Sequence, residues 1–142
     1  MHFEDGFHLV VKRDCPTCTL IEPEIRKLVE SGDFGQNLRI YIQDDPSYLS
    51  DLSQSVSDAS LESSYRLKIE TVPTLIRFEN GEETSRSVGW VRKEWSQLLN
   101  EPMFGEHLPE SRPGCGSLTV MPGVKETLDA RFGDLPLNSR TI

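Results

Sequence analysis

The sequence predicts an α/β domain over residues 1–100, followed by a Pro/Gly-rich C-terminal extension over residues 101–142. Apolar patterns typical of strands and helices alternate along the first part, whereas the second part holds five of the nine prolines. The chain has 142 residues, of which 36% are hydrophobic and 27% are charged. This length and composition are those of a globular protein with one hydrophobic core.

The domain begins with a strand, a helix and a second strand. Residues 7–12 (FHLVVK) are dense in β-forming side chains, which indicates a short buried strand. Pro16 suits the first turn of a helix, because a proline has no N–H to leave unpaired there, and Gly32 marks the end of that helix. Its apolar stripe consists of Leu20, Ile21, Ile25, Leu28 and Val29. Residues 38–43 (LRIYIQ) then alternate as a strand does.

The next segment is polar. Residues 44–60 are rich in serine and aspartate, which predicts a loop or a weak helix at the surface. Asp58 is a candidate N-cap for a short helix whose buried face would hold Leu61, Tyr65 and Leu67.

A hairpin and a last helix complete the domain. Residues 71–78 (TVPTLIRF) predict a strand, and Asn80-Gly81 is a strong turn signal before a returning strand that ends near Val88. Residues 91–100 predict a helix, with Val91, Trp95, Leu98 and Leu99 facing inward. The predicted order is therefore β-α-β-α-β-β-α. In the extension we expect one short helix, over residues 125–132.

The charge excludes some classes of partner. A net charge of −8 and an isoelectric point near 4.9 argue against binding to nucleic acid or to an anionic membrane, because both need a basic surface. No apolar run reaches the length of a membrane span. We therefore expect the protein in the cytoplasm, where disulfides are usually transient and catalytic.

The motif Asp14-Cys15-Pro16-Thr17-Cys18 lies where the first strand meets the first helix. Unpaired N–H groups and the positive end of the helix dipole stabilise a thiolate at that place. The pKa of such a cysteine can fall from about 8.5 to between roughly 3.5 and 7.5. We therefore expect Cys15 to be the nucleophile. Cys18, one turn further on, would be the thiol that resolves the mixed disulfide.

Two cysteines at this spacing can also bind zinc or form a structural disulfide. A zinc site needs four ligands at characteristic spacings, and the other candidates have no such spacing. These candidates are His2, His8, His107 and Cys115. A structural disulfide is uncommon in a reducing compartment. The sequence thus predicts no metal site, and it places His8 as an ordinary strand residue.

Four spaced features resemble the thioredoxin family. The Cys-x-x-Cys motif follows the first core strand, and Pro23 lies five residues after Cys18. Val72-Pro73-Thr74 opens an apolar strand before a glycine turn, in the manner of the family's cis-proline segment. Gly89 precedes the last helix, as in that family. The resemblance covers roughly residues 7–100.

The resemblance implies a fold and a substrate site. The fold would be a central mixed sheet of four strands with helices on both faces. The Val72–Pro73 peptide would be cis and would face Cys15, so that the backbone of Val72 could pair with an extended substrate segment. Gly89 and Trp90 would lie at the rim of this site, although Trp90 could equally pack on the last helix.

The activity implied is reversible thiol–disulfide exchange with protein or small disulfide substrates. The redox-active disulfide Cys15–Cys18 would need no other cofactor, and a reductase or a low-molecular-weight thiol would donate electrons. Two alternatives stay open: a binding or adaptor module with little catalysis, and a carrier of a metal or metalloid on the Cys15–Cys18 pair.

The sequence also departs from the family pattern. Asp14 replaces the usual tryptophan before the first cysteine, and Leu9 stands where a buried aspartate commonly accepts the resolving thiol's proton. Lys12 and Glu22 are the candidates for a displaced proton relay. Cys115, in the extension, is either a spectator or a thiol that folds back to exchange disulfides with Cys15.

Overall fold

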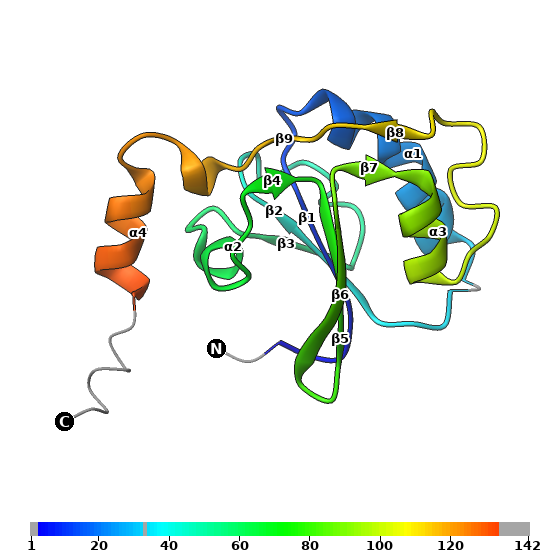
Figure 1. The fold of residues 1–142 in the computed structure, drawn as a ribbon, viewed down its shortest axis with the longest axis horizontal. Coiled ribbons are helices and arrows are strands. Elements are labelled where there is room, and N and C mark those ends of the chain that lie inside the picture. Colours follow the sequence, from blue (N-terminus) through cyan, green and yellow to red (C-terminus); the bar gives the residue numbers. More distant parts are fainter. Residues whose placement is uncertain (1–2, 33, 134–142) are drawn as a thin grey trace.

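The computed structural model describes residues 3–32 and 34–133. Its centre is a mixed five-stranded sheet in the order β3-β2-β1-β5-β6 (Figure 1). The strands are β1 (Gly6–Val11), β2 (Leu38–Ile42), β3 (Ser55–Ser57), β5 (Thr74–Glu79) and β6 (Glu82–Val88). Strands β1, β2 and β3 are parallel to one another, whereas β5 is antiparallel to both β1 and β6. The predicted α/β class is confirmed.

The sheet has one strand more than the four that the resemblance implied. Strand β3 lies within residues 44–60, which were predicted to be a loop or a weak helix. Ser55 pairs with Ile40, and Ser57 pairs with Ile42. The segment Ser-Val-Ser has no apolar alternation of its own, so its extended form depends on the free edge of β2. Only tertiary pairing could reveal this strand.

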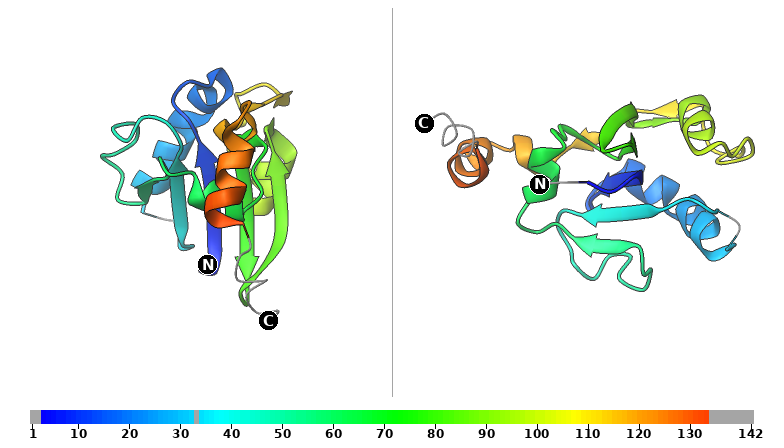
Figure 2. Two further views of the ribbon diagram at one scale, coloured as in Figure 1. Left: turned by 90° about the vertical axis from the view of Figure 1, so that its left-hand side faces the viewer. Right: turned by 90° about the horizontal axis from the view of Figure 1, so that it is seen from below.

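Two helices lie on one side of the sheet, and a short helix lies on the other (Figures 1 and 2). Helix α1 (Pro16–Glu30) and helix α3 (Arg92–Leu99) share the first side, and α2 (Glu62–Arg66) lies on the second. The predicted apolar stripe of α1 is buried at Ile21, Ile25 and Leu28. Burial of each such side chain contributes about 1.5–3 kcal/mol to folding. Pro23 lies within α1 on its exposed side.

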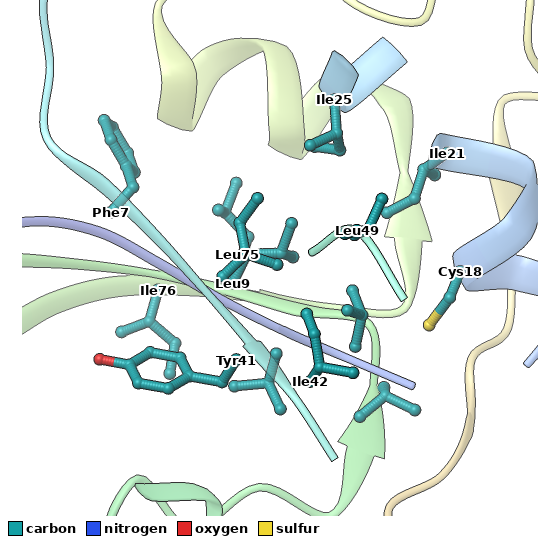
Figure 3. Packing of buried hydrophobic residues seen from close by; sticks show 14 of the residues in the cluster. Phe7, Leu9, Cys18, Ile21, Ile25, Tyr41, Ile42, Leu49, Leu75 and Ile76 are labelled. Atoms are coloured by element: carbon teal, nitrogen blue, oxygen red, sulfur yellow. The ribbon is translucent and has the colours of Figure 1, made fainter. Parts of the chain in front are cut away.

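The sheet separates two layers of the core. Leu75 and Ile76 are adjacent in β5 and point to opposite faces, because side chains alternate along a strand (Figure 3). Leu9 and Leu75 face α1, where they pack with Ile21 and Ile25 (Figure 3). All of these side chains are buried, so α1 is fixed against the sheet at the end that carries the two cysteines.

Two of the predicted local signals have clear structural counterparts. Asn80 and Gly81 have φ values of +55° and +80°, which is the left-handed backbone that a two-residue hairpin turn requires. The carboxylate of Asp58 accepts hydrogen bonds from the backbone N–H groups of Ser63 and Ser64, at 3.0 and 2.9 Å. Asp58 therefore accepts from N–H groups of the first turn of α2, as a cap does, but the N-cap position itself is Leu61 and not Asp58 as predicted.

The extension folds back onto the domain. Strand β8 (Ser111–Arg112) pairs with β7 (Trp90–Val91), and strand β9 (Cys115–Gly116) pairs with β4 (Thr71–Val72). Both pairings are antiparallel. A 3-10 helix, η1 (Leu118–Val120), and helix α4 (Val124–Phe132) follow. The helix expected over residues 125–132 is therefore confirmed within one residue. The segment with β8 and β9 crosses the end of the molecule where α1 begins (Figure 1).

None of the helices in the described residues is both long and apolar enough to span a membrane.

Candidate active site

Cys15 caps helix α1. Its backbone is extended, with φ −156° and ψ 109°, and its Sγ accepts a hydrogen bond from the N–H of Cys18 at 3.3 Å. This is the geometry of an N-cap side chain, in which an acceptor satisfies an unpaired donor of the first turn. The sulfur of Cys18, from the first turn of α1, is directed toward the sheet (Figure 3). Both thiols are free and buried.

The two thiols of the motif differ in acidity. The pKa of Cys15 is lowered to about 5, first by a hydrogen bond from the Cys18 thiol and further by donation from the Cys115 thiol and from backbone N–H groups. The pKa of Cys18 is raised, because its thiol donates to Cys15 and because it is buried. Near neutral pH the site therefore holds one thiolate, on Cys15, beside a protonated partner.

The backbone of Val72 borders the sulfur of Cys15. The Val72–Pro73 peptide is cis, and the carbonyl oxygen of Val72 lies 3.6 Å from Cys15 Sγ. The carbonyl of Pro73 accepts a hydrogen bond from the N–H of Gly89 at 2.8 Å. Val72 thus borders Cys15, and Pro73 and Gly89, which the sequence also assigned to substrate binding, are hydrogen-bonded to each other next to Val72.

The chain's own extension fills the space beside Val72. Cys115 pairs with Val72 in the β4–β9 ladder, and Cys115 Sγ lies 2.7 Å from Cys15 Sγ. Cys15 is only 2% exposed in this arrangement. Of the two alternatives for Cys115, the geometry favours the thiol that folds back onto Cys15.

Trp90 does not lie at an exposed rim. Its side chain is fully buried, packs with Trp95 and Phe104, and donates a hydrogen bond from Nε1 to the carbonyl of Pro109 at 2.8 Å. The hypothesis of a substrate platform at Trp90 is therefore wrong for this structure. The alternative is confirmed: Trp90 packs against Trp95 of the last helix. The surface over Trp90 is closed by the extension, whose fold the sequence pattern did not indicate.

The two candidates for a proton relay have other partners. The ammonium of Lys12 donates to the carbonyl of Gly116 at 2.7 Å, and Glu22 pairs with Arg26 at 3.0 Å. Leu9 is completely buried in the core, where the family commonly has an aspartate. Sequence reasoning missed Tyr48, which is buried near the site. Burial raises the pKa of Tyr48, and the negative charge of Glu22 raises it further.

The segment before Cys15 is held by Asp44. The carboxylate of Asp44 accepts hydrogen bonds from the backbone N–H groups of Arg13 and Asp14, at 2.7 and 3.0 Å. The side chain of Arg13 points outward and pairs with Asp45 at 3.2 Å. Asp44 therefore fixes the entry to α1, a role that the serine- and aspartate-rich pattern of residues 44–60 did not single out.

In the part of the chain that the structure describes, no group of three or more His, Cys, Asp or Glu side chains could hold a metal ion. His8 is buried in the sheet, where its Nδ1 lies 2.9 Å from the hydroxyl of Tyr41 and its Nε2 lies 2.7 Å from the carbonyl of Glu4. Both ring nitrogens of His8 thus have protein partners.

No protein-family model matches the sequence, and no curated protein matches it. Solved structures do resemble the fold. StoA from Bacillus subtilis matches with a TM-score of 0.53 and 16% identity, over 69% of this chain and 85% of StoA. A putative thioredoxin from Neisseria meningitidis matches with a TM-score of 0.51 and 18% identity, over 73% of this chain and 82% of that protein.

The fold is thioredoxin-like. At these identities the similarity concerns the fold alone, and the chemistry of the site depends on the residues themselves.

Proposed function

We propose that this protein is a thiol–disulfide oxidoreductase that exchanges its Cys15–Cys18 pair with protein or small disulfide substrates. The observation that carries the proposal is the position of Cys15 Sγ, which accepts the Cys18 N–H at the start of α1 and has a pKa lowered to about 5. A thiolate is the nucleophile of disulfide exchange, so this sulfur is ready to react.

The reaction follows from the two thiols. The Cys15 thiolate attacks one sulfur of a substrate disulfide, and the other substrate sulfur leaves as a thiolate. Cys18 then loses its proton and attacks Cys15 Sγ, so the mixed disulfide breaks and a Cys15–Cys18 disulfide forms. The substrate gains two electrons, which the two cysteines lose. No bound cofactor is needed, and a reductase or a low-molecular-weight thiol in the cytoplasm would return the electrons.

Val72 supports the binding of an extended substrate. Its backbone pairs with an antiparallel strand in the structure, with Cys115 of that strand opposite Val72. A substrate segment in the same position would bring its own cysteine to Cys15, with main-chain hydrogen bonds supplying affinity. Gly89 borders the same strand, because a Cβ at Gly89 would lie 3.1 Å from the backbone nitrogen of Gly114.

The test is the reduction of insulin with dithiothreitol as electron donor. Wild-type protein should accelerate the reaction, and the Cys15→Ser variant should fall to the rate of dithiothreitol alone. The Cys18→Ser/Cys115→Ser double variant should accumulate a mixed disulfide between Cys15 and insulin, because neither of the two thiols beside Cys15 is left to displace insulin. Background rates for the wild type, together with no mixed disulfide in the double variant, would refute the proposal.

One observation favours a second function. Cys15 is only 2% exposed, and the chain's own residues occupy the place beside Val72. A binding or adaptor module with little catalysis would be compatible with such a covered site. The insulin assay separates the two functions, because an adaptor would give equal rates for the wild type and Cys15→Ser.

A further inference from the structure

The segment around Cys115 is anchored on one side by buried polar groups. Ser117 is fully buried, and its hydroxyl accepts a hydrogen bond from Nε2 of Gln43 at 2.8 Å. The other end of the same amide, Oε1 of Gln43, accepts from the N–H of Leu118 at 3.0 Å. Gln43 is itself 2% exposed. A buried amide is costly without partners, so the extension supplies bonds that this position, directly after β2, requires.

A second anchor lies on the other side of Cys115. The side chain of Arg92 donates to the carbonyl of Leu108 at 2.6 Å, and its backbone N–H donates to the carbonyl of Glu110 at 2.8 Å. Trp90 adds the bond to Pro109. The segment is therefore held at both ends, on either side of Cys115, and runs across the active site between them.

Between the anchors, the backbone of the segment contacts both sides of the active site. The Thr17 hydroxyl, in the first turn of α1, donates to the carbonyl of Pro113 at 2.7 Å. The Lys12 ammonium donates to the carbonyl of Gly116 at 2.7 Å. On the opposite side Cys115 pairs with Val72, and a Cβ at Gly114 would come within 2.4 Å of the carbonyl oxygen of Val72. Only glycine therefore fits immediately before Cys115.

We propose that residues 111–117 are a built-in substrate strand and that Cys115 forms an intramolecular disulfide with Cys15. This inference rests on the proposed function, because it requires Cys15 to exchange disulfides. The strand has the features that an external substrate would need: an extended backbone paired with Val72, a small residue before the cysteine, and a sulfur 2.7 Å from Cys15 Sγ. An external disulfide must displace this strand to reach Cys15.

The exchange is an isomerisation in the oxidised protein. Cys115 gives up its proton and attacks Cys15 Sγ; the Cys15–Cys115 bond forms while the Cys15–Cys18 bond breaks, and Cys18 leaves and takes up a proton. One disulfide and one thiol are present before and after, so no external oxidant is consumed. In the reduced protein, glutathione disulfide supplies the oxidation. The Cys15 thiolate attacks it, which forms a mixed disulfide and releases one glutathione. Cys115 then attacks Cys15 Sγ and displaces the second glutathione. Two molecules of glutathione are released.

Peptide mapping of full-length protein, equilibrated in glutathione redox buffers and quenched with acid, tests the inference. Wild type should yield linked peptides for both Cys15–Cys18 and Cys15–Cys115, and Cys18→Ser should yield Cys15–Cys115 alone. The matched Cys115→Ser variant should yield only Cys15–Cys18. If the Cys15–Cys115 peptide is absent from the wild type or from Cys18→Ser, while Cys15 still forms the Cys15–Cys18 disulfide or a mixed disulfide with glutathione, the inference fails and the proposed function survives. If Cys15 forms no disulfide with Cys18, Cys115 or glutathione in any variant, both fail.

A pair of glycine variants tests the docked strand itself. In the Cys18→Ser background, Gly114→Ala should lower the yield of the Cys15–Cys115 disulfide about tenfold, because its Cβ collides with the backbone of Val72. Gly116→Ala is the control, since its Cβ would have only an ordinary contact, 3.9 Å from Val120. Equal yields in the two variants would show that pairing of the strand with Val72 does not bring Cys115 to Cys15, and would overturn the inference. Circular dichroism checks that both variants are folded.

Discussion

The Sγ atoms of Cys15 and Cys115 lie 2.7 Å apart, although the two cysteines are separated by 100 positions in the sequence. The contact joins the start of α1 to an extension that folds back across it. It brings a third thiol to a Cys-x-x-Cys pair and covers the sulfur that we propose as the nucleophile. Each of the following predictions depends on this arrangement or on the residues that maintain it.

Ser117→Ala should release the extension from the domain. The variant loses the bond from Gln43 and the bond from the N–H of Thr119 to Ser117 Oγ, at 3.1 Å. We expect a loss of about 1–2 kcal/mol in the free energy of unfolding, measured with urea, and faster alkylation of Cys115 by iodoacetamide. Ser111→Ala, at an exposed position of the same extension, is the control. No difference between the two variants would show that the buried bonds do not hold the segment.

Cys115→Ser should raise the rate of insulin reduction. Without the Cys15–Cys115 disulfide, a larger fraction of the protein is open to external substrates, and we expect an increase of roughly two- to tenfold. Urea unfolding should confirm that the stability of the variant is close to that of the wild type. A fall to the rate of Cys15→Ser would contradict the prediction, because Cys115 would then be required for turnover and would not compete with the substrate.

Trp90→Ala should destabilise the fold. Trp90 is fully buried against Trp95 and Phe104, so its truncation leaves a large cavity and should cost about 3–5 kcal/mol of unfolding free energy. Met103→Ala, at a side chain that is 65% exposed, should change stability by less than about 0.5 kcal/mol. A stable Trp90→Ala protein that reduces insulin more slowly would instead restore Trp90 as a substrate-binding residue.

The local signals of the first hundred residues were sufficient to predict most of the domain. The stripe of Ile21, Ile25 and Leu28, and the Asn80-Gly81 turn, are short-range patterns that correspond directly to α1 and the β5–β6 hairpin. The place of the Cys15 thiol could also be predicted locally, because the sequence puts Cys15 between the end of a strand and the start of a helix.

The remaining features depend on contacts between distant parts of the chain. Strand β3 is extended because it pairs with β2, and Trp90 is buried because the extension closes over it. The role of Gln43 becomes visible only when Ser117 and Leu118 are beside it. No periodicity in residues 101–120 indicates where that segment lies, because its order comes from hydrogen bonds to the domain and from few apolar contacts of its own.

The most direct test of the account is the titration of the Cys15 thiol in the fully reduced protein. The ultraviolet absorbance of the thiolate is measured against pH, and the absorbance of Cys15→Ser is subtracted from that of the wild type. The thiolate fraction rises with pH through the pKa, so the account predicts a midpoint at about 5 and a complete transition before neutral pH. In Cys18→Ala the midpoint should move upward, because the side-chain donor that contributes most to the lowering is gone. A wild-type midpoint near the ordinary value of about 8.5 would contradict the account.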